Sequence, residues 1–214
     1  NLDVIREALH NGLGYAVSDK YKQYTHALVE AFKNGGSADS IDLTPVQAIH
    51  QRVFKNVDGI KFLNHQGGCG GIRQDSAILS KLLVAYADHP NVSGVTVLSL
   101  GCQNLQVNDF LNDLKVRNPE FDKPLYIFEQ QQSQSEEELI TEAIRKTFEG
   151  LVEINDLERK PATLDKLCVG VKCGGSDGFS GISANPAVGY CSDLLVALGA
   201  KVLLAEFPES VELV

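Results

Sequence analysis

The apolar positions in the first part of the chain recur every three or four residues, which is the spacing of amphipathic helices. In residues 1–56 this pattern predicts a first helix that begins near residue 2 and ends at Gly12. A second apolar stripe covers residues 21–32. A capping pattern with proline at the first helical position predicts a third helix over residues 44–55.

From residue 57 the pattern changes, and short apolar runs alternate with helical stripes. The runs have the length and composition of strands that are buried in a sheet. The expected strands are residues 57–64, 95–100, 125–128, 167–171 and 201–207. The expected helices between them are residues 79–86, 107–114, 135–148 and 185–198, and Ser135 and Glu138 give the third of these helices a capping box.

Alternation of strand and helix predicts the α/β fold class. We expect an open, mostly parallel sheet with helices on both faces, preceded by a helical N-terminal segment. The domain prediction is therefore a helical segment, 1–56, and an α/β core, 57–214. The chain contains no methionine and stops soon after a strand, so we expect it to be a piece of a longer protein.

Composition narrows the classes of partner. The 214 residues are 43% hydrophobic and 22% charged, with a formal net charge of -9. Such a balance argues against nucleic acid and anionic membranes as partners, because both require a basic surface. No apolar run reaches the roughly 20 residues that span a bilayer. Five cysteines, an odd number, favour a reducing, cytoplasmic location in which thiols act as ligands, reactive groups or core residues.

Three of the five cysteines follow expected strands, each beside glycine: Cys69, Cys102 and Cys173. Ligands of open α/β sheets bind beyond the carboxyl ends of the strands, so we expect these thiols to share a site. Cys168 lies inside an expected strand and Cys191 on the apolar face of a helix. We expect both to be core residues.

Further polar residues accompany these cysteines, among them His65, Arg73, Gln103, Asn104, Asp177 and Glu206. Arg73 is either an anion clamp or a surface residue, and Glu206 is either a site residue or a solvated loop acid. The remaining histidines that lack nearby ligand-type partners are expected to be surface or packing residues: His10, His26 and His50.

Three thiolates and a histidine suit a soft or borderline metal, which here means iron, zinc or an iron–sulfur cluster. The cysteine spacings do not match the short pairs of a zinc finger. Three protein ligands leave one position for substrate, which favours a catalytic metal. An alternative is thiol chemistry without metal, in which Cys69 is a nucleophile activated by His65.

Three segments resemble the altronate dehydratase and galactarate dehydratase family, to which sulfolactate sulfo-lyase is related. They are residues 64–71, 98–104 and 172–187. The resemblance runs from about residue 57 to 208. Residues 1–56 match nothing in that comparison, and the family's small N-terminal domain and further C-terminal part are absent.

The resemblance implies a hydro-lyase that dehydrates a sugar acid such as D-altronate or galactarate to a 2-keto-3-deoxy acid. It implies iron as the cofactor, either Fe²⁺ or a cluster, with another divalent metal as the alternative. The implied metal ligands are Cys69, Cys102 and Cys173; the implied catalytic residues are His65, Arg73, Asp177 and Glu206. The implied substrate-binding residues are Gln103, Asn104, Gly174, Gly175, Ser176 and Asn185.

Two other functions stay open at this point. One is a carbon–sulfur lyase that resembles sulfolactate sulfo-lyase, and the other is a non-catalytic domain that binds a sugar acid. In each case the partner is a small-molecule sugar acid or its sulfonate analogue. A homo-oligomer is also compatible with the sequence.

Overall fold

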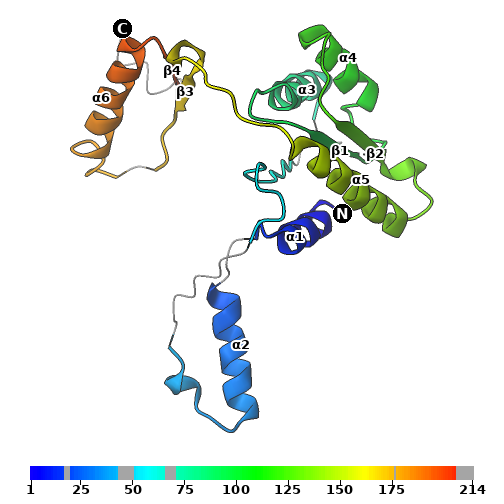
Figure 1. Ribbon diagram of the computed structural model, residues 1–214, viewed down its shortest axis with the longest axis vertical. Coiled ribbons are helices and arrows are strands. Elements are labelled where there is room, and N and C mark those ends of the chain that lie inside the picture. The colour runs from blue at the N-terminus through cyan, green and yellow to red at the C-terminus, as the bar shows by residue number, and fades with distance from the viewer. Residues whose placement is uncertain (17–19, 43–50, 66–70, 176, 206–214) are drawn as a thin grey trace. The chain divides into compact units, whose positions relative to one another are not determined.

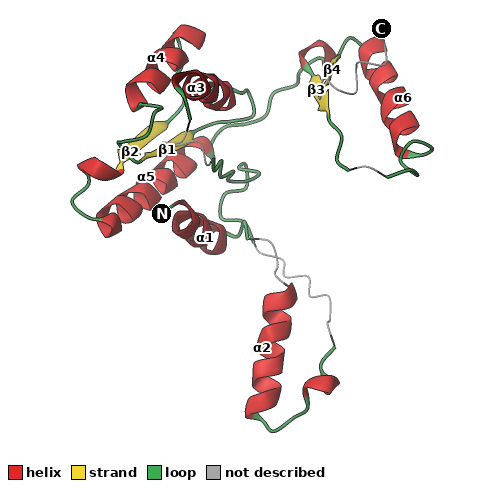
Figure 2. Cartoon of the chain, turned by 180° about the vertical axis from the view of Figure 1, so that it is seen from behind, coloured by secondary structure: helices red, strands yellow, loops and turns green. Residues whose placement is uncertain are grey.

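The computed structural model describes residues 1–16, 20–42, 51–65, 71–175 and 177–205. The chain forms two compact units, Asn1–Glu158 and Arg159–Val214. Figure 1 shows the elements of each unit, and Figure 2 shows the same elements from behind. The boundary expected at residue 57 stays a prediction.

The first unit begins with two helices, as the apolar stripes predict. They are α1 (Leu2–Leu13) and α2 (Lys20–Lys33), followed by the short 3-10 helix η1 (Ala38–Ser40). Helix α1 does not end at Gly12. It continues to Leu13 and is capped by Gly14 with φ of 77°, because the left-handed cap conformation suits glycine. Helix α1 buries Ile5, Leu9 and Leu13, whereas no side chain of α2 is buried in the described part of the chain.

A pair of parallel strands forms the centre of this unit. Strand β1 (Val95–Ser99) pairs with β2 (Leu125–Glu129), in a register that places Val95 opposite Leu125. Helix α4 (Val107–Arg117) connects the two strands, which makes the β-α-β crossover that parallel pairing requires. The remaining elements are α3 (Arg73–Ala87), the 3-10 helix η2 (Gln130–Gln132) and α5 (Glu136–Ile154).

Helices cover both faces of the β1–β2 pair, with α3 and α4 on one face and α5 on the other (Figures 1 and 2). Val95 and Val97 of β1 pack against the α3–α4 cluster, and Leu98 packs against the α1–α5 cluster. Side chains alternate between faces along a strand, so one short strand contributes to two hydrophobic clusters. The prediction of helices on both faces is confirmed for this pair.

The prediction of a strand over residues 57–64 is wrong, since these residues have no regular structure. Val57 is buried in the cluster with α1, and Asn56 binds Asn155 beyond the end of α5. The Val57 carbonyl accepts a hydrogen bond from Tyr15 Oη, and His10 Nε2 lies 3.1 Å from the carbonyl oxygen of Ile60. Contacts with α1 and with Tyr15, just beyond its end, therefore satisfy backbone groups that a strand would direct to a neighbouring strand.

The third helix expected over residues 44–55 is not present in its described part, because residues 51–55 are not helical. The remainder of that prediction lies outside the described residues. The backbone N–H of Val53 instead donates to the carbonyl of Leu13 at the end of α1. This segment is thus a connection that packs on α1.

The second unit contains a second pair of parallel strands. Strand β3 (Cys168–Val171) pairs with β4 (Lys201–Leu204), and α6 (Ala184–Ala197) connects them. A 3-10 helix, η3 (Leu164–Lys166), precedes β3. The strands of the described chain therefore form two separate pairs, and the α/β fold class with parallel strands and N-terminal helices is confirmed.

The prediction that Cys168 and Cys191 are core residues is wrong, since both are exposed. Ala200 is the one described residue of this unit that is buried. A two-stranded pair with a single connecting helix offers too little surface to enclose the thiols. In the described residues of the whole chain, no helix is long and apolar enough to cross a membrane.

Candidate active site

The loop that follows β1 is closed by one side chain, Gln103, which is half-buried. Its Oε1 accepts a hydrogen bond of 2.8 Å from the Gly101 N–H. Its Nε2 donates to Ser99 Oγ at 2.6 Å and to the Leu105 carbonyl at 3.0 Å. Ser99 is buried at the end of β1, so the loop is anchored to the sheet. Cys102 is exposed within this loop.

The loop is also joined to the start of α3. Asn104 Nδ2 donates a hydrogen bond to the carbonyl oxygen of Gly71, a residue 33 positions earlier in the chain. Two residues after Gly71, Arg73 begins α3 and is exposed. Asp75 accepts a hydrogen bond of 3.1 Å from the Ile72 N–H and caps this end of the helix. The structure thus brings the end of the first glycine-rich motif to the loop that carries Cys102.

His65 ends the described part of the segment that precedes this glycine-rich motif, and it is exposed. The segment is held by the Tyr15 hydroxyl, just beyond α1, and by the ring of His10 within α1. Tyr15 Oη donates to the Phe54 and Val57 carbonyls, and the ring of His10 packs edge-on against Phe62 at 5.2 Å. His10 is therefore a packing residue and His26 is exposed, as predicted, whereas His50 lies outside the described residues.

The third motif lies in the second unit, between β3 and α6. Cys173, Gly174 and Gly175 are exposed and directly follow β3. Asp177 Oδ1 accepts from the Phe179 N–H at 3.1 Å and its carbonyl accepts from the Ser180 N–H, which forms a tight turn. Asn185 lies in the first turn of α6. The residues of this motif thus lie on the connection from β3 to α6, and ligands of α/β sheets bind at such connections beyond the carboxyl ends of strands.

Three of the predicted site residues lie outside the described residues: Cys69, Ser176 and Glu206. Of the other two proposed metal ligands, Cys102 belongs to the first unit and Cys173 to the second. Among the described residues, no group of three or more His, Cys, Asp or Glu side chains is placed to hold a metal ion. The described donors alone therefore do not make a complete metal site, and the three-cysteine ligand set stays a prediction.

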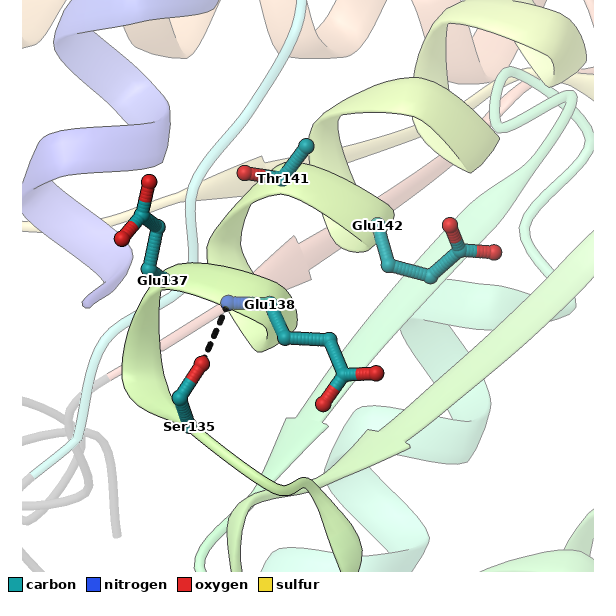
Figure 3. A pocket seen from close by; sticks show the side chains of 5 residues that line it. All are labelled: Ser135, Glu137, Glu138, Thr141 and Glu142. Atoms are coloured by element: carbon teal, nitrogen blue, oxygen red, sulfur yellow. Dashed lines mark hydrogen bonds between the residues drawn. The ribbon is translucent and has the colours of Figure 1, made fainter.

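An open hollow elsewhere in the first unit has the wrong charge for a sugar acid. It lies at the start of α5, where Ser135 Oγ accepts a hydrogen bond from the Glu138 N–H (Figure 3). Its lining residues are Ser135, Glu137, Glu138, Thr141 and Glu142. Carboxylates at this density repel an anionic substrate. The Ser135–Glu138 contact confirms the capping pattern predicted for this helix.

Ser99 has a part in the site that the sequence alone did not indicate. Its hydroxyl accepts hydrogen bonds from both Gln103 Nε2 and the Gly101 N–H. The available signal in the sequence was that Ser99 ends an apolar strand and lies two residues before a glycine. Its role follows only from the return of the Gln103 side chain toward β1.

Parallel strand pairs with polar and sulfur side chains after the strands are typical of ligand-binding domains in α/β enzymes. Comparison with known families agrees with this class. Residues 14–155 match the second domain of D-galactarate dehydratase/altronate hydrolase, and residues 164–213 match the C-terminal domain of D-galactarate/altronate dehydratase. The expectation that residues 1–56 do not resemble the family is therefore wrong for residues 14–56. The chain therefore belongs to the galactarate/altronate dehydratase family.

Individual relatives support the assignment. Altronate dehydratase of Bacillus subtilis is 36% identical over 159 residues, which are 71% of this chain and 29% of the relative. Altronate dehydratase of Escherichia coli is 36% identical over 155 residues, 72% of this chain and 30% of that protein. Galactarate dehydratase (L-threo-forming) of Escherichia coli is 36% identical over 124 residues, 56% of this chain and 24% of that protein.

The chain spans less than a third of the length of these three relatives. The beta subunit of (2R)-sulfolactate sulfo-lyase from Chromohalobacter salexigens is also similar, with 28% identity over 162 residues, 76% of this chain and 40% of that subunit. No solved structure matches the chain significantly.

Proposed function

We propose that this chain forms part of the active site of a hydro-lyase that dehydrates a sugar acid such as altronate or galactarate to a 2-keto-3-deoxy acid. The observation that carries the proposal is the match of both units to consecutive domains of one dehydratase family. The hydrogen bond from Asn104 to Gly71 supports it, because it joins two of the three segments that resemble this family.

The reaction removes a proton from the carbon next to the carboxylate and hydroxide from the following carbon. The resulting enol tautomerises to the 2-keto acid. A base must take the proton, and positive charge must hold the carboxylate while negative charge develops on it. We assign binding of the substrate carboxylate to Arg73 and the first N–H groups of α3, since a helix N-terminus and a guanidinium both favour anions.

We assign the proton transfer to His65, which is exposed at the end of its segment. Asp177, at the tight turn after β3, is assigned to the substrate hydroxyls. The family resemblance also supports an iron site formed by Cys69, Cys102 and Cys173. When bound, such a metal would stabilise charge on the substrate carboxylate and assist departure of the hydroxyl.

The test measures 2-keto acid formation by the protein, purified without oxygen, from altronate and from galactarate. The variant is Cys102→Ser, and Cys191→Ser is the matched control because Cys191 is another exposed thiol outside the three motifs. We expect turnover of one acid that is lost in Cys102→Ser and kept in Cys191→Ser. Full turnover in both variants would overturn the role of Cys102.

A second measurement separates the competing functions. Iron, zinc and acid-labile sulfide per chain distinguish a mononuclear site from a cluster, and both from thiol chemistry without metal. Thermal stabilisation by a sugar acid without turnover would favour the non-catalytic binding domain. Release of sulfite from sulfolactate would favour the carbon–sulfur lyase, for which the 28% identical subunit is the supporting observation. A cytoplasmic location is part of the same proposal.

A further inference from the structure

The side chain of Gln103 makes three hydrogen bonds within its own loop. The orientation of its amide is determined by the backbone, because the Gly101 N–H can only donate and the Leu105 carbonyl can only accept. The Nε2 atom also donates to Ser99 Oγ at 2.6 Å. Both polar atoms of the Gln103 amide are thus bound to the residues on either side of Cys102.

The backbone around Cys102 is constrained further at Gly101. Its φ is 95°, a backbone conformation that residues other than glycine rarely adopt. A Cβ at Gly101 would lie 3.0 Å from Gln131 Oε1, so the loop after β2 packs against this turn. The carbonyl of Gln103 accepts a further hydrogen bond from the Gln106 side chain. Cys102 therefore lies between two residues whose positions are determined by several contacts.

We infer that Gln103 is a positioning residue that holds the Cys102 backbone at the carboxyl end of β1, and is not a residue that binds substrate. The functional meaning of this inference rests on the proposed function, whereas the structural part does not. Both N–H groups of the Gln103 amide are already donated, to Ser99 Oγ and to the Leu105 carbonyl, so donation to a substrate would break one of these bonds for each substrate molecule. A reactive group held in place before the reaction needs no such rearrangement.

The two roles predict different kinetics. A positioning residue affects the reacting group, so its loss lowers kcat and leaves KM within roughly twofold. A substrate-binding residue affects affinity, so its loss raises KM. Amide hydrogen exchange also separates the two roles, because the Gly101 N–H donates to Gln103 Oε1 at 2.8 Å and more distantly to Ser99 Oγ at 3.2 Å. Its exchange rate therefore reports on the loop without turnover.

The experiment compares Gln103→Leu and Gln103→Glu with Gln132→Leu in the whole protein. Gln132 is the matched control, since its amide donates to Glu129 at the end of β2 and Gln132 is exposed. In Gln103→Leu we expect the Gly101 amide to exchange several-fold faster, because it loses the 2.8 Å bond to Gln103 and keeps only the longer bond to Ser99 Oγ. We expect kcat to fall by roughly tenfold or more, and Gln132→Leu to match the wild type in both measurements.

Gln103→Glu keeps the inference testable if the leucine variant does not fold. A carboxylate still accepts from the Gly101 N–H but cannot donate to the Leu105 carbonyl, so kcat should fall while Gly101 exchange stays near the wild-type rate. Unchanged Gly101 exchange in a folded Gln103→Leu variant would overturn the inference. So would a raised KM with unchanged kcat. An absence of dehydration in the wild type would refute only the proposed function, because the exchange result would still stand.

Discussion

Asn104 Nδ2 donates a hydrogen bond to the carbonyl oxygen of Gly71, and this contact joins the loop after β1 to the start of α3. It connects two motifs that are distant in sequence. Since Arg73 begins α3 two residues after Gly71, the same contact places the proposed carboxylate-binding residue relative to the loop of Cys102. Within the first unit, the Asn104–Gly71 bond therefore connects the loop that carries the Cys102 thiol to the helix that begins with Arg73.

Asn104→Asp should loosen the start of α3. A carboxylate cannot donate to the Gly71 carbonyl, and two acceptors would face each other. The loss of one hydrogen bond corresponds to about 0.5–1.5 kcal/mol of local opening free energy, so the Ile72 amide should exchange several-fold faster. Hydrogen exchange followed by mass spectrometry measures this. Asn112→Asp, at an exposed position of α4, controls for the added charge. Equal exchange in both variants would show that the contact does not stabilise the helix start.

Substitution by alanine should change the free energy of unfolding in opposite directions at the two glycines near the end of α1. At Gly14, φ is 77° and an added Cβ would lie 2.5 Å from the Gln51 carbonyl oxygen, which is backbone and cannot move aside cheaply. Gly14→Ala should therefore lower the free energy of unfolding by about 1–2 kcal/mol or more. At Gly12, within α1, nothing lies within 4 Å of an added Cβ. Gly12→Ala should raise the free energy of unfolding by about 0.5–1 kcal/mol. Urea unfolding of both variants measures the difference, and a shift of the same sign in both would contradict the structure.

Tyr15→Phe should release the segment that leads to His65. The Tyr15 hydroxyl lies 3.2 Å and 2.9 Å from the carbonyl oxygens of Phe54 and Val57, and burial raises the pKa of this phenol. Removal of the hydroxyl should cost about 1 kcal/mol of unfolding free energy, because it leaves these carbonyls without that donor. Thermal or urea unfolding measures the loss. Tyr190→Phe, at a mostly exposed position of α6, is the control and should have no comparable effect.

Asp88 should make the stability of the α3–α4 layer depend on pH. Hydrogen bonds from Asn118 and Arg117 lower the pKa of the Asp88 carboxyl below its usual value. A lowered folded-state pKa means that the stabilisation is complete above the unfolded-state pKa of about 3.9, and is lost as pH falls through the folded-state pKa. Asp88→Asn should therefore be less stable than the wild type at pH 7, with a difference that shrinks toward roughly pH 3. Urea unfolding at both pH values tests this, with Glu7→Gln on α1 as a control. A difference that grows on acidification would refute the assignment.

Elements whose signals are local were predicted correctly. The helices α3, α4 and α5 and the Ser135–Glu138 cap depend on residues within a few turns of one another, and all are present. The buried face of α3 is formed by Ser80, Val84 and Ala87, and Leu82 and Tyr86 of the predicted stripe are exposed. The strands at 95–99 and 125–129 were predictable for the same reason, since each is a short apolar run between turn residues. The order of these elements was enough to predict parallel pairing.

Predictions that depend on distant partners were less secure. An apolar run such as residues 57–64 can become a strand or an irregular buried segment, and here α1 supplies the contacts that a neighbouring strand would have made. Cys168 and Cys191 have the sequence context of core residues, but burial depends on what packs over them. The amide of Gln103 has the chemistry to bind substrate, but its partners are within its own loop.

The sequence by itself determined the fold class, the capped start of α5 and the placement of Cys102 and Cys173 after strands, because hydrophobic period, capping chemistry and strand order are local or sequential properties. Only the tertiary structure decided that residues 57–64 pack on α1, that Asn104 binds Gly71 and that Gln103 closes the loop around Cys102. Those contacts join residues by their positions in space, and no regular spacing along the chain encodes which carbonyl a given amide will bind.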